Sequence, residues 1–403
     1  MLQVLPSLDT GGAERGCVDV ALALVRAGGV ALVASSGGRM VRELERGGAR
    51  HVTLPVHSKN PFVMRANAGR LAELVRAHGV DILHARSRAP AWSAYWAARR
   101  TGCKLVTTVH GPYSAGWPKK FYNAVMTKGD RVVAISAFIA RYIETHYAGV
   151  TPRVTVIHRG IDPAVFDPAR VDPGRMVTLA ADWRLPDGAP VVLLPGRLTR
   201  WKGQAVLIEA IARLGRRDIA VVIVGSDQGR HAYRRELEAL VERRNLGGIV
   251  RLMPDCRDMA AAYMLADVVV SASTDPEAFG RVAAEAQAMG RPVIVTDHGA
   301  SRETVIEGET GLIVPPGDPG RLADAIRDSL ALEAGRRAEI AAAAMAHIRA
   351  RFTKDVMCRA KLALYREVAS GARAGRASVA QHRPRDATST TRKGPRGRDA
   401  TAP

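Results

Sequence analysis

The chain has 403 residues, 47% of them hydrophobic, which is enough for two domains with separate cores. No apolar run approaches the ~18 residues of a membrane-spanning helix, and the four cysteines are too far apart for a zinc site or a disulfide scaffold. The formal net charge is +20, and residues 1–170 carry 23 Lys and Arg against 11 Asp and Glu. This asymmetry suggests an anionic partner for the first half, although an Arg-rich composition alone would produce the same excess.

The first half alternates short apolar runs with amphipathic stretches. A first strand is expected at residues 2–5, so we expect no signal peptide. A loop with Gly11 and Gly12 then leads into a helix that ends near residue 27. Further strands are expected at 30–34, 51–54, 81–84, 105–109, 131–135 and 154–157, and helices near 38–47, 63–77, 89–100, 118–127 and 136–147. The pattern predicts an open, doubly wound α/β domain over residues 1–170, with ligands at the carboxyl ends of its strands, where His110 lies.

Glycine and proline interrupt the pattern at 160–174, and a second alternating set follows. Its strands are expected at 191–194, 219–224, 249–252, 266–271 and 292–296, and its helices near 202–213, 230–244, 256–264, 280–289, 318–332 and 335–350. This set predicts a second Rossmann-like domain over 171–352. A helix at 353–369 follows. Residues 370–403 are basic, with almost nothing to bury, so we expect a disordered tail.

The stretch 275–293 places two acids around the start of a helix. Glu277 lies in the loop before that helix and Glu285 lies about one and a half turns inside it. The backbone N–H groups of Gly280, Arg281 and Val282 would have no partners within the helix, so they offer an anion site at the positive end of its dipole. An amphipathic helix with two surface acids would give the same spacing without any function.

A second basic loop opens the second domain at residues 194–203. Arg197 and Lys202 are close enough in sequence to converge on one pyrophosphate, and both groups suit phosphate oxygens. The loop is not a Walker loop, because it lacks the Gly-Lys-Ser/Thr sequence. No Asp-x-Asp sequence and no histidine cluster is present, so we expect neither a metal nor another cofactor. A solvated basic turn is the simpler alternative.

Together these motifs resemble retaining glycosyltransferases of the GT-B fold, family 4. Glu277, Phe279, Gly280 and Glu285 match that family's two-glutamate signature, with Ala278 where the family more often has Gly. The turn with Gly11 and Gly12 and the loop with Arg197 and Lys202 match two further elements, and the resemblance covers residues 1 to about 368.

The resemblance implies two Rossmann-like domains that face an interdomain cleft, with the helix at 353–369 returning to the first domain. It implies that Arg197 and Lys202 neutralise the leaving diphosphate, and that Glu285 binds ribose. Glu277 would bind the transferred sugar, with His110 facing it from the first domain. Gly11, Gly12, Phe279 and the helix start at 280–282 would lie against the donor.

The reaction implied is transfer of a hexose from a nucleotide sugar to a glycan or glycolipid, with retention, in lipopolysaccharide or surface-polysaccharide assembly. Residues 86–131 hold nine basic residues and one acid among several aromatic residues, a mixture that suits an anionic membrane surface. We therefore expect a cytoplasmic protein, peripheral on the inner face of the membrane, with no nucleic-acid partner. Another GT-B enzyme, such as a sugar-nucleotide epimerase, and a basic nucleic-acid-binding protein remain as alternatives.

Overall fold

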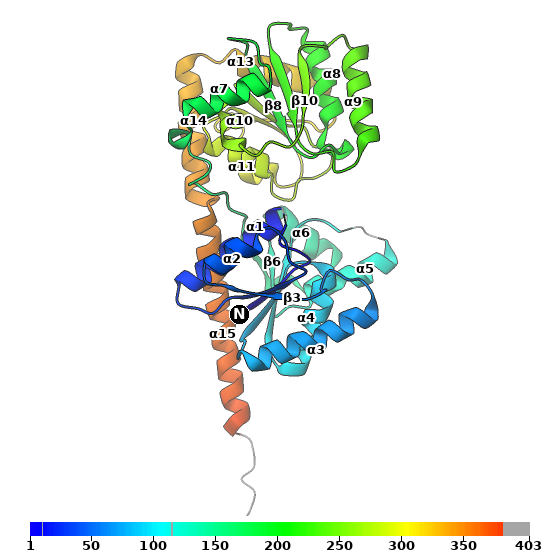
Figure 1. The fold of residues 1–403 in the computed structure, drawn as a ribbon, viewed down its shortest axis with the longest axis vertical. Helices are drawn as coiled ribbons and strands as arrows, with labels where there is room; N and C mark the ends of the chain where they lie inside the picture. Colours follow the sequence, from blue (N-terminus) through cyan, green and yellow to red (C-terminus); the bar gives the residue numbers. More distant parts are fainter. Residues whose placement is uncertain (10, 114–115, 382–403) are drawn as a thin grey trace, which may run out of the picture.

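The structure is a computed structural model that describes residues 1–9, 11–113 and 116–381. Two α/β domains lie one above the other, and two successive C-terminal helices flank them (Figure 1). Helix α14 (Ala334–Arg351) lies against the second domain, and α15 (Lys354–Gln381) lies against the first. Each domain is built on its own parallel sheet, of seven and six strands. The expected fold, two doubly wound Rossmann-like domains, is confirmed.

The first sheet has the order β3-β2-β1-β4-β5-β6-β7. Its strands are β1 (Leu2–Val4), β2 (Leu32–Ser35), β3 (Arg50–Thr53), β4 (Ile82–Ala85), β5 (Lys104–Val109), β6 (Arg131–Ala134) and β7 (Val154–Val156). Most of these strands are buried and rich in Val and Leu, as expected for a parallel sheet covered on both faces. The strand order reverses between β1 and β4, which is where doubly wound sheets place their ligand sites.

Helices cover both faces of this sheet. They are α1 (Gly12–Arg26), α2 (Val41–Arg46), α3 (Pro61–Ala77), α4 (Arg88–Thr101), α5 (Trp117–Asn123) and α6 (Ala137–His146), with short 3₁₀ turns at Ala124–Thr127, Thr151–Arg153 and Pro168–Arg170. The start of α3 shows how local sequence fixes where a helix begins. Asn60 accepts hydrogen bonds from the N–H groups of Phe62 and Val63, and Pro61 occupies the first turn, where it needs no donor.

The second sheet has the order β10-β9-β8-β11-β12-β13. Its strands are β8 (Val191–Pro195), β9 (Ala220–Val224), β10 (Val250–Met253), β11 (Val268–Ser271), β12 (Val293–Thr296) and β13 (Leu312–Val314). The helices are α7 (Pro173–Asp182), α8 (Gln204–Leu214), α9 (His231–Arg243), α10 (Met259–Leu265), α11 (Arg281–Ala288), α12 (Ser301–Thr304), α13 (Pro319–Leu330) and α14 (Ala334–Arg351), with a 3₁₀ turn at Arg200–Lys202.

Two elements of this domain differ from the sequence expectation. No helix was expected at residues 173–182, and residues 173–174 were assigned to the break, but Asp172 caps a helix there and Pro173 occupies its first turn. No strand was expected at residues 312–314, but they pair with β12 as the edge strand β13. Both elements are short, and each contains or adjoins glycine or proline, which conceals the periodic pattern.

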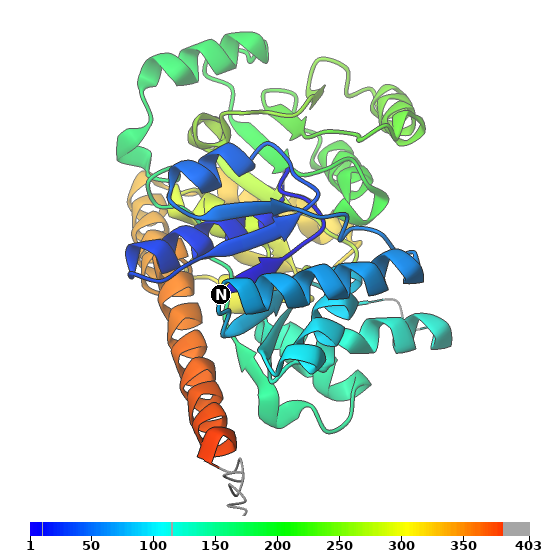
Figure 2. The same ribbon diagram turned by 60° about the horizontal axis from the view of Figure 1, so that its bottom comes forward.

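Helix α15 (Lys354–Gln381) leaves the second domain and packs against the first (Figures 1 and 2). Met357, Leu364 and Tyr365 of α15 are buried against Val20, Ile82 and Val106 of the first domain. The helix continues to Gln381, so the expectation of disorder from residue 370 is wrong for 370–381, where no proline interrupts an Ala-rich sequence. The rest of the expected tail, 382–403, lies outside the described residues.

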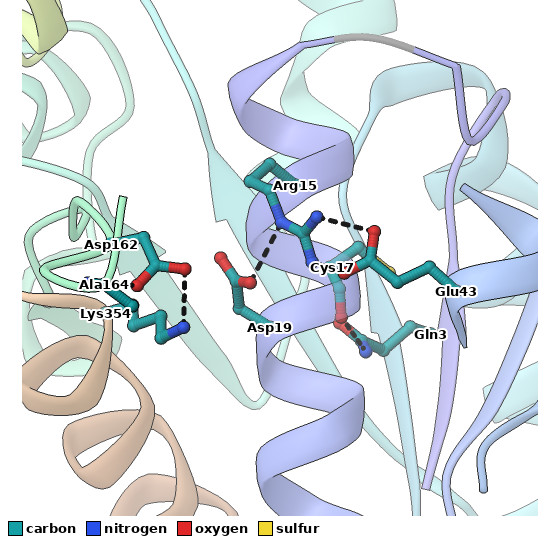
Figure 3. A network of polar contacts seen from close by, with 8 residues as sticks. All are labelled: Gln3, Arg15, Cys17, Asp19, Glu43, Asp162, Ala164 and Lys354. Atoms are coloured by element: carbon teal, nitrogen blue, oxygen red, sulfur yellow. Dashed lines mark hydrogen bonds and ion pairs between the residues drawn. The ribbon is translucent and has the colours of Figure 1, made fainter. Parts of the chain in front are cut away.

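The chain crosses between the domains beside the start of α15. The N–H of Ile161 donates to the carbonyl of Phe352 at 2.8 Å, and the N–H of Lys354 donates to the carbonyl of Ile161 at 2.7 Å. Lys354 also pairs with Asp162 at 2.6 Å, facing the network of Arg15 and Asp19 on α1 and Glu43 on α2 (Figure 3). These contacts tie both interdomain connections together at one point.

Candidate active site

A groove of about 470 Å³ lies between the carboxyl ends of the two sheets. Its walls come from the ends of β5 and β6, the segment after β7, and the loops after β8 and β11. The residues that line it are His110, Gly111, Pro112, Ile135, Arg159, Arg197, Trp201, Lys202, Asp275, Pro276, Glu277, Ala278, Phe279, Gly280 and Arg281. The structure therefore brings His110 of the first domain opposite Arg197, Lys202 and Glu277 of the second.

The loop after β8 presents Arg197 and Lys202 to the groove. Lys202 ends a 3₁₀ turn, and Gly203 follows in the left-handed conformation with φ 72° at the start of α8. A Cβ on Gly203 would lie 1.8 Å from the carbonyl oxygen of Ala272, so only glycine lets this loop sit against the end of β11. The turn thus fixes where the Lys202 ammonium enters the groove.

Glu277 is held in place by four neighbours. Its carboxylate forms an ion pair with Lys202 and accepts a hydrogen bond from Ser273 Oγ at 2.7 Å. Its carbonyl accepts the N–H of Ala300 at 2.8 Å, while Gly299 packs closely over its backbone. Glycine is again required, because a Cβ on Gly299 would lie 2.3 Å from the Glu277 carbonyl. Side chain and backbone of this acid are both positioned before any ligand arrives.

The start of α11 provides the expected row of backbone donors. Gly280 precedes the helix in the left-handed conformation with φ 82°, and no side chain of the described residues caps it. The N–H groups of Arg281 and Val282 are in the first turn, which has no intrahelical partners. Gly280 and Arg281 line the groove, but Val282 does not.

Glu285 lies one turn farther along α11, where it is buried. One carboxylate oxygen accepts from Arg281 Nε at 2.7 Å and the other from the hydroxyl of Tyr263 at 2.9 Å. Burial, followed by the charge of Glu285, raises the pKa of Tyr263 well above its usual value. The Tyr263 hydroxyl therefore keeps its proton and donates a hydrogen bond to Glu285. Glu285 does not line the groove, and its role as a ribose ligand stays a prediction.

His110 forms a hydrogen bond with Arg159, which was not among the site residues expected from the sequence. Arg159 Nη2 lies 3.0 Å from His110 Nδ1, and Nε2 of His110 is buried without a partner among the described residues. Burial, then the positive charges of Arg159, Arg86 and Lys361, lowers the pKa of His110 well below its usual value. Arg159 is itself affected, since burial and the nearby Arg281 lower its pKa to about 10.

The remaining predicted residues lie beside the groove. Gly12 begins α1 next to Arg159 and Arg281, and Gly11 precedes it. Phe279 contributes to the wall but is 3% exposed and packs edge-on against Phe352, so it is mainly a core residue. Sequence reasoning missed Ser273, Tyr263 and Arg159, because a single polar residue without a repeated spacing gives no local signal.

Comparisons with known proteins agree with this arrangement. Residues 10–165 match the family model described as Glycosyltransferase Family 4, and residues 178–346 match Glycosyl transferases group 1. A D-inositol 3-phosphate glycosyltransferase of Xylanimonas cellulosilytica is 32% identical over 311 residues, 73% of this chain and 74% of the relative.

Solved structures extend the likeness to the whole fold. A glycosyltransferase of Rickettsia africae is 36% identical, with a TM-score of 0.85 and coverage of 91% of this chain and 97% of that one. The Anabaena protein HepE, in complex with UDP and glucose, is 25% identical with a TM-score of 0.77, covering 90% of this chain and 98% of that one. These matches favour a transferase over the epimerase and nucleic-acid-binding alternatives. Both domains of this chain, and the groove between them, belong to a GT-B glycosyltransferase of family 4.

Proposed function

We propose that the protein transfers a hexose from a nucleotide sugar to an acceptor hydroxyl, with retention at the anomeric carbon and without a metal ion. The observation that carries this proposal is the meeting of Arg197, Lys202 and the start of α11 in one groove, opposite His110. Two cations and a row of backbone donors suit a diphosphate. The complex of the related HepE with UDP and glucose supports a uridine nucleotide as the first donor to test.

The chemical step places negative charge on the diphosphate as the bond between the sugar and the phosphate oxygen breaks. Arg197 and Lys202 would stabilise that charge, because preorganised cations act most strongly where charge develops. A phosphate oxygen of the departing diphosphate would take the proton from the acceptor hydroxyl, which attacks from the same face. Glu277 would accept hydrogen bonds from the sugar hydroxyls, and the Nε2–H of His110 would donate to the sugar from the opposite wall.

The metal-independent part of the proposal rests on these cations. Arg197 and Lys202 supply the charge that a divalent ion supplies in other sugar transferases. Glu277 in the same groove is already paired with Lys202 and hydrogen-bonded to Ser273.

The acceptor has two candidate classes. The first is the hydroxyl of a glycan or glycolipid in lipopolysaccharide or surface-polysaccharide assembly. The second is a small phosphorylated polyol, since the relative of 32% identity is named a D-inositol 3-phosphate glycosyltransferase. Arg281, which lines the groove beside Gly12, would suit the phosphate of such an acceptor.

A membrane-bound acceptor would need the protein to approach an anionic surface. The structure supports this with exposed Lys119 and Lys120 on α5, next to Phe121, which is 72% exposed. Among the described residues, no helix is long and apolar enough to cross a bilayer. We therefore propose peripheral binding through residues 86–131.

The test has two stages. Thermal-shift measurements against a panel of nucleotide sugars should show one donor that raises the melting temperature, because binding stabilises the folded state. Incubation of that donor with phosphorylated inositol and with lipid-linked glycans, followed by NMR of the product, should give the acceptor and the same anomeric configuration as the donor. An inverted product would overturn retention, and the absence of any transfer would overturn both acceptor classes.

A further inference from the structure

We propose that Arg159 is a positioning residue that holds His110 in a single tautomer, with the proton on Nε2, so that His110 acts in the groove only as a hydrogen-bond donor. The part that concerns substrate rests on the proposed function. The tautomer itself does not, and it can be observed in the free protein.

The hydrogen bond between the two residues determines the tautomer. Arg159 Nη2 is 3.0 Å from His110 Nδ1, and a guanidinium group has donors but no acceptor. Nδ1 must therefore offer its lone pair, and the proton of the neutral ring must be on Nε2. That nitrogen is buried and has no hydrogen-bond partner in the part of the chain that the structure describes. A buried N–H without a partner is costly, and the ring belongs to the wall of the groove, so a ligand oxygen would satisfy it.

The charges around His110 oppose its protonation from several directions. Arg159 comes from the segment after β7, Arg86 from the end of β4, and Lys361 from α15. His84 on β4 is also nearby, and its pKa too is lowered well below the usual value by burial and by Arg86 and Lys361. Among the described residues, the charged groups that lower the pKa of His110 are all cationic, and together with burial they disfavour protonation of the ring. It has no free lone pair to accept a proton, which excludes it as a general base.

The fold holds Arg159 where it can make this contact. One residue earlier, His158 Nε2 lies 2.8 Å from Glu303 Oε2 of the second domain. Two residues later, Ile161 is hydrogen-bonded to Phe352 and Lys354. On the other side, a Cβ on Gly12 would lie 2.0 Å from Arg159 Nη1, so glycine at this position leaves room for the guanidinium group.

Nitrogen NMR of protein labelled with ¹⁵N-histidine tests the proposal directly. The His110 signals would be assigned from the spectrum of His110→Gln. In the wild-type protein without substrate, His110 should show a protonated Nε2 and an unprotonated Nδ1 from about pH 5.5 to 8.5. In Arg159→Met the ring should populate both tautomers, or become protonated at the acid end. Arg159→Lys should restore most of the wild-type pattern, because an ammonium group can also donate to Nδ1. Arg170→Met, which changes an exposed arginine of the same interdomain segment, should leave the spectrum unchanged.

Kinetics then separate positioning from a structural role. Arg159→Met should lower kcat by roughly tenfold, the loss expected for one misplaced hydrogen bond, with a smaller change in the donor KM. The kcat of Arg159→Met should also fall at acid pH, whereas the kcat of the wild-type protein should not change there. A wild-type His110 with its proton on Nδ1 would overturn the proposal, and that spectrum decides even if Arg159→Met fails to fold. An unchanged tautomer in folded Arg159→Met would overturn it as well. If the wild-type protein shows the predicted NMR pattern but transfers no sugar, the proposed reaction alone is contradicted.

Discussion

Lys202 and Glu277 form an ion pair inside the groove, although they come from loops after two different strands of the second sheet. Each side chain is 15% exposed, so the pair is largely shielded from solvent. The Lys202 ammonium therefore lies beside an acid whose expected role is to bind the sugar. A donor diphosphate would draw the ammonium toward its own oxygens, which would leave Glu277 free to accept hydrogen bonds from the sugar. Changes at these two positions should consequently be coupled rather than additive.

Glu285→Gln should act mainly on donor affinity. The expected ribose contact changes little during the reaction, so its loss should raise the donor KM by about tenfold with little change in kcat. Glu285 also binds Arg281 and Tyr263, which makes Tyr263→Phe a useful comparison, because it removes one bond to the same carboxylate without changing its charge. Steady-state kinetics with varied donor would measure both. A large fall in kcat at constant KM would place Glu285 in the chemical step instead.

Activity should persist in EDTA. Arg197, Lys202 and the start of α11 supply the positive potential that the diphosphate requires, so removal of divalent ions should change kcat by less than about twofold. The measurement is initial rate before and after chelation, with Mn²⁺ or Mg²⁺ added back. Complete loss of activity in chelator, restored by either ion, would contradict the metal-independent mechanism.

Reversing the charges of Lys119 and Lys120 should weaken binding to anionic membranes. Each lysine near such a surface contributes about 1 kcal/mol, so Lys119→Glu with Lys120→Glu should lower partitioning into phosphatidylserine vesicles by roughly 30-fold or more. Arg235→Glu with Arg243→Glu makes the same charge change on exposed positions of α9 in the other domain and should have a much smaller effect. Equal losses in the two double variants would mean that net charge alone governs binding.

Glu303 should make interdomain stability depend on pH. It accepts the N–H groups of Ala137 and Phe138 at 2.7 Å each, and it contacts His158 across the domain boundary. Burial alone would raise the pKa of Glu303, but the hydrogen bonds from His158 and the two amides outweigh it and lower the pKa below its usual value. A lowered acid pKa stabilises the fold above the unfolded value of ~4.3, and that stability is lost as the pH falls through the folded pKa.

Glu303→Ala should therefore lower the free energy of unfolding by about 1–3 kcal/mol at pH 7, and the difference should shrink as the pH approaches 3.5. Urea unfolding followed by circular dichroism at several pH values would measure this. Glu309→Ala, at an exposed position of the same region, serves as the control. A constant difference across the pH range would mean that Glu303 contributes through packing rather than charge.

The order of strands and helices was predictable because most of the parallel strands are short Val- and Leu-rich runs between amphipathic helices. Elements that lack this contrast between apolar strands and amphipathic helices could not be predicted. Helix α7 begins with Pro173 and Gly174, which in a sequence indicate a turn, and only the capping contact of Asp172 shows a helix. The sequence past residue 370 is Ala-rich and contains no proline before residue 384, which favours continuation of α15 but gives no periodic pattern to recognise.

The candidate site was predictable where residues share one segment. Arg197 and Lys202 are five residues apart, and Glu277 to Gly280 are contiguous, so local spacing revealed both groups. Arg159 and Glu303 could not be found this way, because their partners, His110 and Ala137, are 49 and 166 residues distant in sequence. Only the docking of one domain on the other brings Glu303 to α6.

A double variant tests whether Arg197 and Lys202, both in the loop after β8, act together on the leaving diphosphate. Arg197→Ala should lower turnover as Lys202→Ala does, and the double variant should lose less than the product of the two effects, because both cations act on one diphosphate. Lys59→Ala, which removes an exposed lysine of the first domain, should leave kcat unchanged.

The measurement that tests the account most directly is the kcat of Lys202→Ala with the identified nucleotide sugar, after circular dichroism confirms that the variant is folded. Charge grows on the diphosphate as the sugar departs, so Lys202 should bind the transition state more tightly than the ground state. We predict a loss of a hundredfold or more in kcat, or about 3–4 kcal/mol of transition-state stabilisation, with a smaller change in donor KM. A folded Lys202→Ala protein that keeps near-normal kcat would contradict the assignment of this loop to the leaving group.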